Sequence, residues 1–560
     1  MSSPARRRSR PPYWLLLAFP LIMMIPPPLG VALAIAAVLL RVAITVARAL
    51  AARRARAAAM EGRSGTVALG VASGGRPVLV SDEQLSAHGL IVGASGAGKS
   101  TTLLRILTEQ VRHGTPVVAI DLKGSPAFAA RLGDSAWAYG RPFALWTPDG
   151  PAHWNPLAHG NATELKDKLI ATERFTEPHY QRAAERYLQT VLQVLEYAER
   201  DRAPTLGEIV SLMDTRRLHG ALRGLPRPMI DRVQDYLEEL PHDQVSAIRG
   251  LAARLAILTE SHTGRYLAPG DRGSAPPIDL RRALTQPGVT LFSLNSSTYG
   301  KLAAQIGTLV IQDLVAAAGR RLDPSPGARG AGLHAGASGL AIVAIDEFSA
   351  LGADHVLALV ARGREAGVSA LLVTQEFVDL ERAGRGLRDQ IIGNTAVKIV
   401  HRQEVPASAQ LVSELIGTER VWEETEQLGG PWLRGYGGSR REVERFVVHP
   451  NEIKTLRQGE AVVIAKVPAT SVERVLISPP AVAAAPAPRA PTAPRTAVAD
   501  APAPPPASPS ASPASVSPAL RRPRAAAAGG VEPAPGRLAA RRSGADPRAS
   551  PDRDRGQTRD

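Results

Sequence analysis

The 560-residue sequence has no cysteine and few aromatic residues. The lack of cysteine excludes disulfides, thiolate zinc sites and cysteine nucleophiles, so any metal must be held by oxygen or imidazole ligands. Aromatic residues make up only 4% of the chain, beside 50 glycines and 47 prolines. This composition indicates that part of the chain is not packed into a core, so the folded part has to be located first.

The centre of the chain also lacks an excess of charge. The formal net charge is +15, but residues 1–60 contain nine arginines and no acid, and residues 478–560 contain twelve arginines against six acids. The two ends therefore account for the whole excess, and residues 61–477 are neutral. A basic path for DNA in the core would have to be a local arrangement, which the net charge does not predict.

The N-terminal residues 1–60 predict a membrane anchor. Two apolar runs, at about 13–25 and 31–47, surround a proline turn at 26–28, and both outer flanks are rich in arginine. The positive-inside bias places both flanks in the cytoplasm, which favours a transmembrane hairpin. Each run is short for a span of about 20 residues, so a single kinked span remains an alternative. A cleaved signal peptide is disfavoured because no convincing cleavage site follows.

Residues 478–560 form a low-complexity tail of proline, alanine, serine and arginine. Such a segment has too few large apolar side chains to offset its chain entropy, so we expect it to be disordered. Binding to a partner protein or to an anionic surface remains open for it.

Residues 61–477 alternate between short apolar runs and helical stretches. Unalternating apolar runs of this kind are typical of a mainly parallel sheet covered on both faces, and therefore of an α/β fold. Between residues 162 and 270 the pattern is helical throughout, which predicts an all-helical domain inserted between two parts of the α/β domain, 61–161 and 271–477. The runs expected to be strands lie at 89–93, 116–124, 288–295, 340–348, 369–375 and 395–402.

The stretch "GASGAGKST" satisfies the P-loop pattern G-x-x-x-x-G-K-[ST] between a predicted strand and a predicted helix. Glycines let the loop turn its N–H groups toward phosphates, and the start of a helix adds partial positive charge. Lys99 is expected to reach the β- and γ-phosphates, and the Ser100 hydroxyl to bind Mg²⁺. The predicted nucleotide-binding residues are Gly93, Ala94, Ser95, Gly96, Ala97, Gly98, Lys99, Ser100 and Thr101.

A second predicted strand, "LAIVAIDEF", ends in two carboxylates. Asp346 is expected to hold Mg²⁺ and Glu347 to orient and deprotonate the attacking water. Gln375 ends the next predicted strand, where its amide could sense the γ-phosphate or that water. An ordinary polar strand end is the alternative for each of these residues, and the P-loop makes the hydrolytic interpretation of the carboxylates the stronger one.

The sequence lacks the N-K-x-D signature of GTPases and the L-S-G-G-Q segment of ABC transporters, which disfavours both classes. Instead "GASGAGKST", "DLKG", "WNPL", "IDEFSALG", "LLVTQ" and "IGNTAVKIVHR" follow one another behind a predicted membrane hairpin. This series resembles the type IV secretion coupling proteins, which are similar to FtsK and HerA motors. The resemblance spans roughly residues 61–477.

The resemblance implies a RecA-like domain in a ring of six, with ATP between subunits and an all-helical domain that faces the cytoplasm. An arginine of the neighbouring subunit would contact the γ-phosphate, and the family's spacing to Gln375 favours Arg364 over Arg362, although a solvated helix arginine is the alternative. Asp121 and Lys123 of "DLKG" would support the site without taking part in catalysis.

The activity implied is that of a Mg²⁺-dependent ATPase in the bacterial inner membrane, with most of its mass in the cytoplasm. Its partners would be DNA, a relaxase or other secreted protein, and components of the secretion channel. Two alternatives stay open, namely an FtsK-type translocase of double-stranded DNA and a recruitment platform whose ATPase gates the hand-over of protein substrates.

Overall fold

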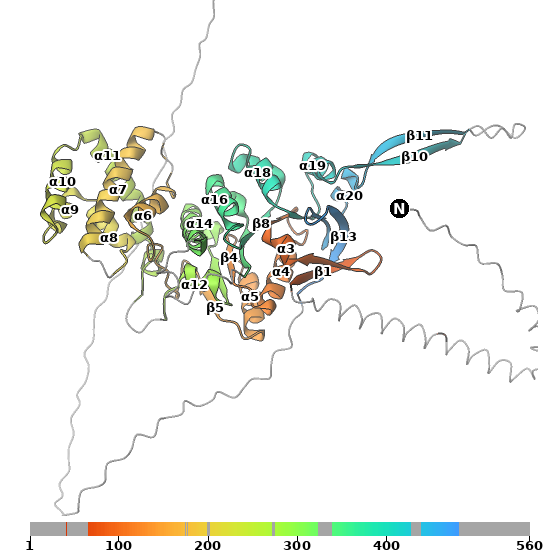
Figure 1. The fold of residues 1–560 in the computed structure, drawn as a ribbon, viewed down its shortest axis with the longest axis horizontal. Helices are drawn as coiled ribbons and strands as arrows, with labels where there is room; N and C mark the ends of the chain where they lie inside the picture. Colours follow the sequence, from red (N-terminus) through yellow and green to blue (C-terminus); the bar gives the residue numbers. More distant parts are fainter. Residues whose placement is uncertain are drawn as a thin grey trace, which may run out of the picture. The chain divides into compact units, whose positions relative to one another are not determined.

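The structure, a computed structural model, describes Arg41 and residues 65–173, 175, 177–198, 202–270, 275–322, 339–426 and 438–480. Arg41 apart, the predicted membrane runs lie outside the described residues, as does the tail from residue 481 onward. Within the described residues, an 11-stranded sheet has the order β2-β1-β13-β12-β9-β3-β8-β7-β4-β6-β5 (Figure 1). Its strands are β1 (Thr66–Ala72), β2 (Pro77–Ser81), β3 (Gly89–Val92), β4 (Val117–Asp121), β5 (Phe143–Trp146), β6 (Val289–Ser293), β7 (Ala341–Asp346), β8 (Val368–Thr374), β9 (Val397–Val400), β12 (Glu460–Ala465) and β13 (Ser471–Ile477).

The strands from β9 to β5 are all parallel to one another. The strands on the other side of β9, from β12 to β2, pair in antiparallel fashion. A separate antiparallel hairpin joins β10 (Thr418–Glu426) to β11 (Gly438–Phe446). Because the parallel strands share one direction, all their carboxyl ends meet at the same edge of the sheet, where open α/β sheets bind ligands.

Helices cover both faces of the sheet, as the alternation of side chains along a strand requires. In β3, Leu90 and Val92 belong to the core that packs against α14 and α16, whereas Ile91 belongs to the core under α4 and α5. The helices outside the stretch 162–266 are α3 (Asp82–Ser86), α4 (Lys99–His113), α5 (Pro126–Ala138), α12 (Leu280–Thr285), α13 (Ser296–Tyr299), α14 (Lys301–Leu322), α16 (Ala353–Gly363), α17 (Phe377–Ala383), α18 (Leu387–Asn394), α19 (Pro406–Ile416) and α20 (Pro450–Lys454), with a 3-10 turn η2 (Phe348–Ala350).

The α/β fold with a mainly parallel sheet is the one that the sequence predicts, and each of the six apolar runs contains a strand. The six predicted runs do not include β5, the antiparallel strands β1, β2, β12 and β13 of the sheet, or the separate hairpin strands β10 and β11. In β13 buried and exposed side chains are mixed, and only Val475 and Ile477 are buried. A strand with this mixed pattern lacks the continuous apolar run that marks a strand covered on both faces.

Between residues 162 and 266 the described residues form helices and no strand. Helix α6 begins with a capping box, in which Asn161 accepts hydrogen bonds from the first turn and Glu164 bonds back to its N–H. The boundaries of the proposed all-helical domain stay a prediction. Its helices are α6 (Ala162–Ile170), α7 (Pro178–Ala198), α8 (Leu206–Leu212), α9 (Thr215–Ala221), α10 (Arg227–Glu238) and α11 (His242–Glu260), followed by the 3-10 turn η1 (His262–Tyr266).

Helix α14 is, among the described residues, the one helix long and apolar enough to cross a membrane. However, 67% of its apolar window is buried within the fold. Its apolar character is therefore explained by packing against the sheet and α16.

A buried polar cluster joins α14 to α6 through the "WNPL" stretch. The Lys168 ammonium lies 2.8 Å from one carboxylate oxygen of Asp313 and 2.8 Å from the carbonyl oxygen of Pro156. The indole N–H of Trp154 donates to the other Asp313 oxygen at 3.3 Å. The side chains of Lys168 and Asp313 are only 2% and 7% exposed, so each charge depends on the other for neutralisation.

We expect Asp313→Ala to lower the free energy of unfolding by about 3–5 kcal/mol, because it leaves the Lys168 ammonium buried without a counter-charge. The double variant Lys168→Met/Asp313→Leu should lose much less, since it removes both charges. Urea denaturation followed by circular dichroism measures these losses. Asp167→Ala, which breaks the exposed pair of Asp167 with Lys166 on the same helix, is the matched control and should cost below about 1 kcal/mol. Equal losses for the two aspartate variants would contradict the buried pair.

Candidate active site

The P-loop lies where the sequence predicts it, between β3 and α4. Gly98 is the N-cap of α4 with φ 118°, and Gly96 has φ 73°, conformations that side chains other than glycine rarely adopt. A Cβ on Gly93 would lie 2.5 Å from the Cβ of His401, so this glycine is required by close packing. Ser100 and Thr101 occupy the first turn of α4, where backbone N–H groups have no partner within the helix.

Lys99 is 5% exposed, and its ammonium is held inside the loop. The ammonium donates to the carbonyl oxygens of Gly93 at 2.5 Å and of Ala94 at 3.0 Å. Burial lowers the pKa of Lys99, and the positive charge of Lys123 lowers it further, whereas the nearby carboxylates oppose the shift. A negatively charged ligand at the loop would therefore favour the protonated form.

The residues that directly follow β9 pack against the P-loop. The Ala94 N–H donates to the carbonyl oxygen of Arg402 at 2.8 Å. His401, which is fully buried, places Nδ1 2.9 Å from the Glu460 carbonyl oxygen and Nε2 2.9 Å from the Thr102 hydroxyl. A carbonyl can only accept, so Nδ1 carries the proton and Thr102 donates to Nε2. Sequence reasoning missed His401, although it lies within the quoted stretch "IGNTAVKIVHR".

Asp346 ends β7, the neighbour of β4, and Glu347 follows directly. Both carboxylates contact Lys123. The Lys123 ammonium lies 3.3 Å from the nearer Asp346 oxygen and 3.2 Å from Glu347 Oε1. Burial raises the pKa of Asp346, and Lys123 opposes this shift. Burial alone would lower the pKa of Lys123, but the two carboxylates outweigh it and raise this pKa. Lys123 is thus in direct contact with both carboxylates. The role predicted for it is to support the site without taking part in catalysis.

Asp121 shapes the turn after β4, and its predicted supporting role stays a prediction. Its carboxylate accepts the N–H groups of Lys123 at 2.9 Å and Ser125 at 2.7 Å, which shapes the turn between β4 and α5. Burial raises the pKa of Asp121, and the bond from Ser125 opposes this shift. Asp121 therefore fixes the backbone that carries Lys123.

Gln375 lies directly after β8 and contacts both parts of the site. Its side-chain amide nitrogen donates to Glu347 Oε1 at 2.5 Å, and its backbone carbonyl oxygen accepts the Gly93 N–H at 3.2 Å. Glu347 has φ 58°, which is uncommon for a residue other than glycine and is often found at functional sites. Because the Gln375 amide donates a hydrogen bond to Oε1 of Glu347, Oε2 is the carboxylate oxygen that can accept a proton.

The chemistry of these groups fits Mg²⁺ and a nucleotide. Asp346 and Ser100 offer carboxylate and hydroxyl oxygens, the ligand type that Mg²⁺ prefers. The carboxylates of Asp346 and Glu347 already share one cationic partner, Lys123, so this edge of the sheet favours positive charge. The glycines of the loop and the free N–H groups of α4 form a cradle that suits phosphate oxygens.

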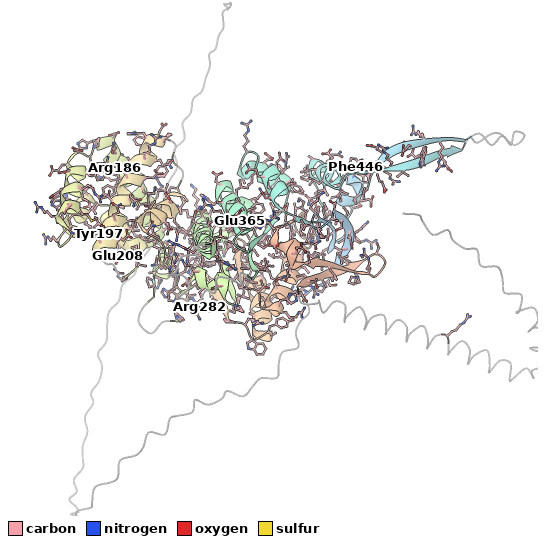
Figure 2. All side chains as sticks on the ribbon, in the orientation of Figure 1. Arg186, Tyr197, Glu208, Arg282, Glu365 and Phe446 are labelled. Atoms are coloured by element: carbon pink, nitrogen blue, oxygen red, sulfur yellow. The ribbon has the colours of Figure 1, made fainter. Side chains whose placement is uncertain are left out.

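Arg364 does not join this group. It directly follows α16 and precedes β8, so it lies at the amino end of the strand whose carboxyl end carries Gln375. Seven residues at about 3.3 Å each separate the two ends. Arg364 is exposed, as are Arg362 and Glu365, the last of which is labelled in Figure 2. Arg364 therefore does not contact the P-loop of its own chain, and its predicted role toward a neighbouring copy stays a prediction beside the alternative of a solvated helix arginine.

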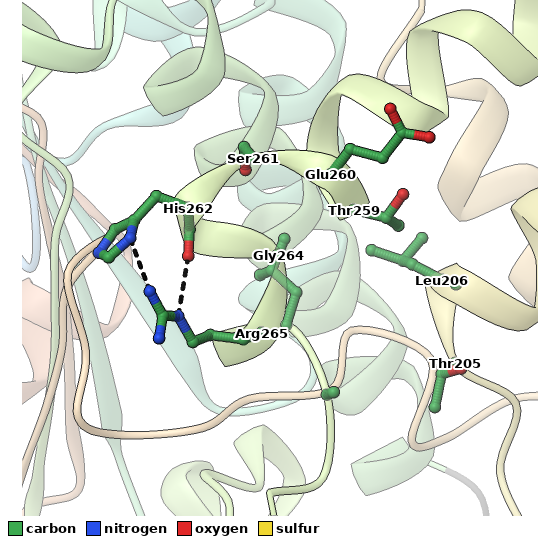
Figure 3. A pocket seen from close by; sticks show the side chains of 11 residues that line it. Thr205, Leu206, Thr259, Glu260, Ser261, His262, Gly264 and Arg265 are labelled. Carbon is green, nitrogen blue, oxygen red and sulfur yellow. Dashed lines mark hydrogen bonds between the residues drawn. The ribbon is translucent and has the colours of Figure 1, made fainter.

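A cavity of about 400 Å³ lies in the helical stretch (Figure 3). It is bordered by the start of α8, the end of α11 and η1, and Arg265 there donates to His262 Nδ1 at 2.8 Å. None of the predicted site residues lines it. The candidate nucleotide site at the carboxyl edge of the sheet is therefore separate from this cavity.

Fold and site together define a P-loop NTPase with a RecA-like core. Residues 341–458 match the family described as the TraM recognition site of TraD and TraG, and residues 49–123 match the FtsK/SpoIIIE family. No curated protein matches the sequence significantly.

Solved structures of TrwB share the fold. The unbound monoclinic form of the bacterial conjugative coupling protein TrwBdeltaN70 is 16% identical with a TM-score of 0.53, over 73% of this chain and 88% of that one. TrwB in complex with ADP and Mg²⁺ is 17% identical with a TM-score of 0.52, over 74% and 90%. VirB4 of Thermoanaerobacter pseudethanolicus is 15% identical with a TM-score of 0.46, over 74% and 97%. The two family matches, together with the fold shared with TrwB, support a type IV secretion coupling protein of the FtsK-like P-loop family.

His401 should make the stability of the protein depend on pH. Burial lowers its pKa to about 4, from an unfolded value of about 6.5, so the unfolded state binds the proton more readily. The stability that neutral His401 contributes is present above pH 6.5 and is lost as the pH falls toward 4. Between pH 7 and pH 5 we expect a loss of about 2 kcal/mol from this residue.

Urea denaturation at pH 7 and pH 5 tests this expectation. The variant His401→Gln should lose that part of the pH dependence, whereas His219→Gln, which changes an exposed histidine on α9, should retain it. An unchanged dependence in His401→Gln would show that other groups cause the loss.

Proposed function

We propose that the protein is a membrane-anchored, hexameric, Mg²⁺-dependent ATPase that transfers DNA, as a single strand bound to a relaxase, into a conjugative secretion channel. The observation that carries the hydrolytic part is the meeting of Lys99, Glu347 and Gln375 at one edge of the sheet, joined by the bonds of Gln375 to Glu347 and to Gly93. The DNA-transfer part is supported by the two family matches and by the likeness to TrwB, which is described as a conjugative coupling protein.

Different residues of this chain have different roles in the proposed hydrolysis. Glu347 takes a proton from the attacking water as the new bond to the γ-phosphorus forms and the bond to the ADP oxygen breaks. Gln375 holds Glu347 Oε1, so the free oxygen keeps a fixed direction. Lys123 supplies the positive charge that lets two carboxylates lie side by side. Mg²⁺, held by Ser100 and Asp346, would neutralise the charge that develops on the phosphate oxygens.

Assembly and membrane anchoring follow from other features. Arg364 lies at the opposite edge of the sheet from its own P-loop, which fits a γ-phosphate contact to the next subunit of a ring. The apolar runs at 13–25 and 31–47, with arginine-rich flanks, support a hairpin in the inner membrane and a cytoplasmic ATPase.

Two other functions each have one observation in their favour. The match of residues 49–123 to the FtsK/SpoIIIE family favours a translocase of double-stranded DNA. The match of residues 341–458 to a TraM recognition site favours a platform that recruits protein substrates.

Glu347→Gln should lower kcat by about 10²–10⁴-fold, because it removes the proton acceptor while leaving the loop intact. Affinity for a fluorescent ATP analogue should change little in this variant and should be lost in Lys99→Ala. Glu365→Gln, an exposed change at the other edge of the sheet, is the matched control and should leave both quantities unchanged. Full activity in Glu347→Gln would remove the assigned base.

The full-length protein in detergent or lipid should hydrolyse ATP faster in the presence of DNA than in its absence. Steady-state rates with single-stranded DNA, duplex DNA or no DNA give the preferred form. A preference for duplex would favour the FtsK-type translocase. Hydrolysis that requires Lys99 and ignores both DNA forms, in a preparation shown to contain rings, would refute DNA transfer and favour the recruitment platform.

A further inference from the structure

The hairpin of β10 (Thr418–Glu426) and β11 (Gly438–Phe446) forms a sheet of two strands (Figure 1). The two strands pair with each other along nine residues, and among the described residues neither has a strand on its other edge. At about 3.4 Å per residue the paired stretch is about 30 Å long. A free edge of this length exposes a row of backbone N–H and C=O groups, which is a template for pairing with another strand.

The hairpin buries little of its own surface. Of the side chains described on its strands, those of Val421, Val443 and Phe446 are half-buried and all the others are exposed. Trp422 is 53% exposed, and the Arg440 guanidinium lies over its ring, 4.8 Å from the ring centre. A two-stranded ribbon without a buried face is only marginally stable in water, so a further strand would stabilise this hairpin.

The charges of the two strands complement each other. Strand β10 has four glutamates and one arginine, whereas β11 has three arginines and two glutamates. Wherever two charged residues stand opposite each other their signs are opposite, at Glu419–Arg445, Arg420–Glu444, Glu423–Arg441 and Glu424–Arg440. Arg441 Nη2 lies 3.2 Å from Glu423 Oε2, and Arg440 Nε lies 3.6 Å from Glu424 Oε1. Opposing pairs of this kind stabilise one register of two strands that are polar on both faces.

The free edge of β10 suits a strand with the same order of charges as β11. Opposing residues of antiparallel strands project to the same face of a sheet, so a third strand on this edge would meet the same β10 side chains as β11 does. Strand β11 of another copy of the chain supplies an opposite charge at all four positions. The contact is head-to-tail, because β10 of one copy pairs with β11 of the next.

We propose that the free edge of β10 binds the free edge of β11 of an adjacent copy, in the register that the hairpin uses internally. This inference rests on the proposed ring, in which the repeated contact leaves neither strand with a free edge. It gives that ring an interaction surface made of residues outside the candidate active site.

Cysteine cross-linking of the full-length protein in detergent or lipid tests the contact, since the chain has no cysteine of its own. Val421 and Val443 stand opposite each other in the register, and neither is charged. A Val421→Cys chain is co-expressed with a Val443→Cys chain and oxidised, so a disulfide between β10 and β11 can form only between copies. We expect a cross-linked dimer from the two chains together and only background from either alone. The control pairs Val443→Cys with His219→Cys, an exposed position on α9, and should also give background.

A charge swap tests the register. The variant Glu423→Arg/Glu424→Arg/Arg440→Glu/Arg441→Glu keeps every charged pair within its own hairpin opposite in sign. Two swapped chains should therefore cross-link as two unswapped chains do. A swapped Val421→Cys chain and an unswapped Val443→Cys chain would place arginine against arginine at two positions, so their cross-linking should fall by about fourfold or more. Loss of the hairpin fold cannot explain such a fall, because each hairpin keeps its internal pairs.

Several outcomes would overturn the inference. Wild-type rings in which the Val421–Val443 cross-link stays at the level of the control would exclude the contact, and cross-linking that ignores the charge swap would exclude the register. A cross-link of Val421→Cys to Ala525→Cys in place of Val443→Cys would make the arginine-rich tail the occupant of the β10 edge. A wild type that forms no ring in electron micrographs would instead refute the proposed ring, so the two failures are distinguishable.

Discussion

The ion-pair cluster of Lys123 with Asp346 and Glu347 is the interaction on which the site depends. Two carboxylates at the end of one buried strand repel each other and lose hydration, and the ammonium of the neighbouring strand offsets both costs. Lys123 can do this because Asp121 fixes its turn and because β4 and β7 pair in register, with Asp121 opposite Asp346. The parallel pairing of β4 and β7 therefore positions the charged side chains of the site as well as the apolar side chains of the core.

The sequence predicts what is encoded locally. The P-loop could be located because glycine, lysine and serine must stand at fixed spacing, and the central strands because burial on both faces leaves a continuous apolar run. Lys123 and His401 depend on contacts between strands far apart in the chain, so their roles could not be read from spacing. Strand β13 was missed for a related reason, since it owes its place to its pairing with β12 and β1 and not to an apolar run.

The direction of the strands also separates two charged sites. The carboxyl edge gathers acids and the P-loop, whereas the amino edge gathers Arg364, Lys398 and Lys466. One chain thus offers complementary charges at opposite edges, and neither edge can satisfy the other within the subunit.

Helix α14 connects the candidate active site to the helical stretch 162–266 through packing contacts. A Cβ on Gly307 of α14 would lie 2.7 Å from Leu351, which follows the Asp346 and Glu347 strand end, so helix and loop are in close contact. Six residues further along, Asp313 of the same helix holds Lys168 of α6 through the buried ion pair. Close-packed interiors leave little free space between such contacts. Helix α14 therefore joins the loop after β7 to the helical stretch by continuous packing.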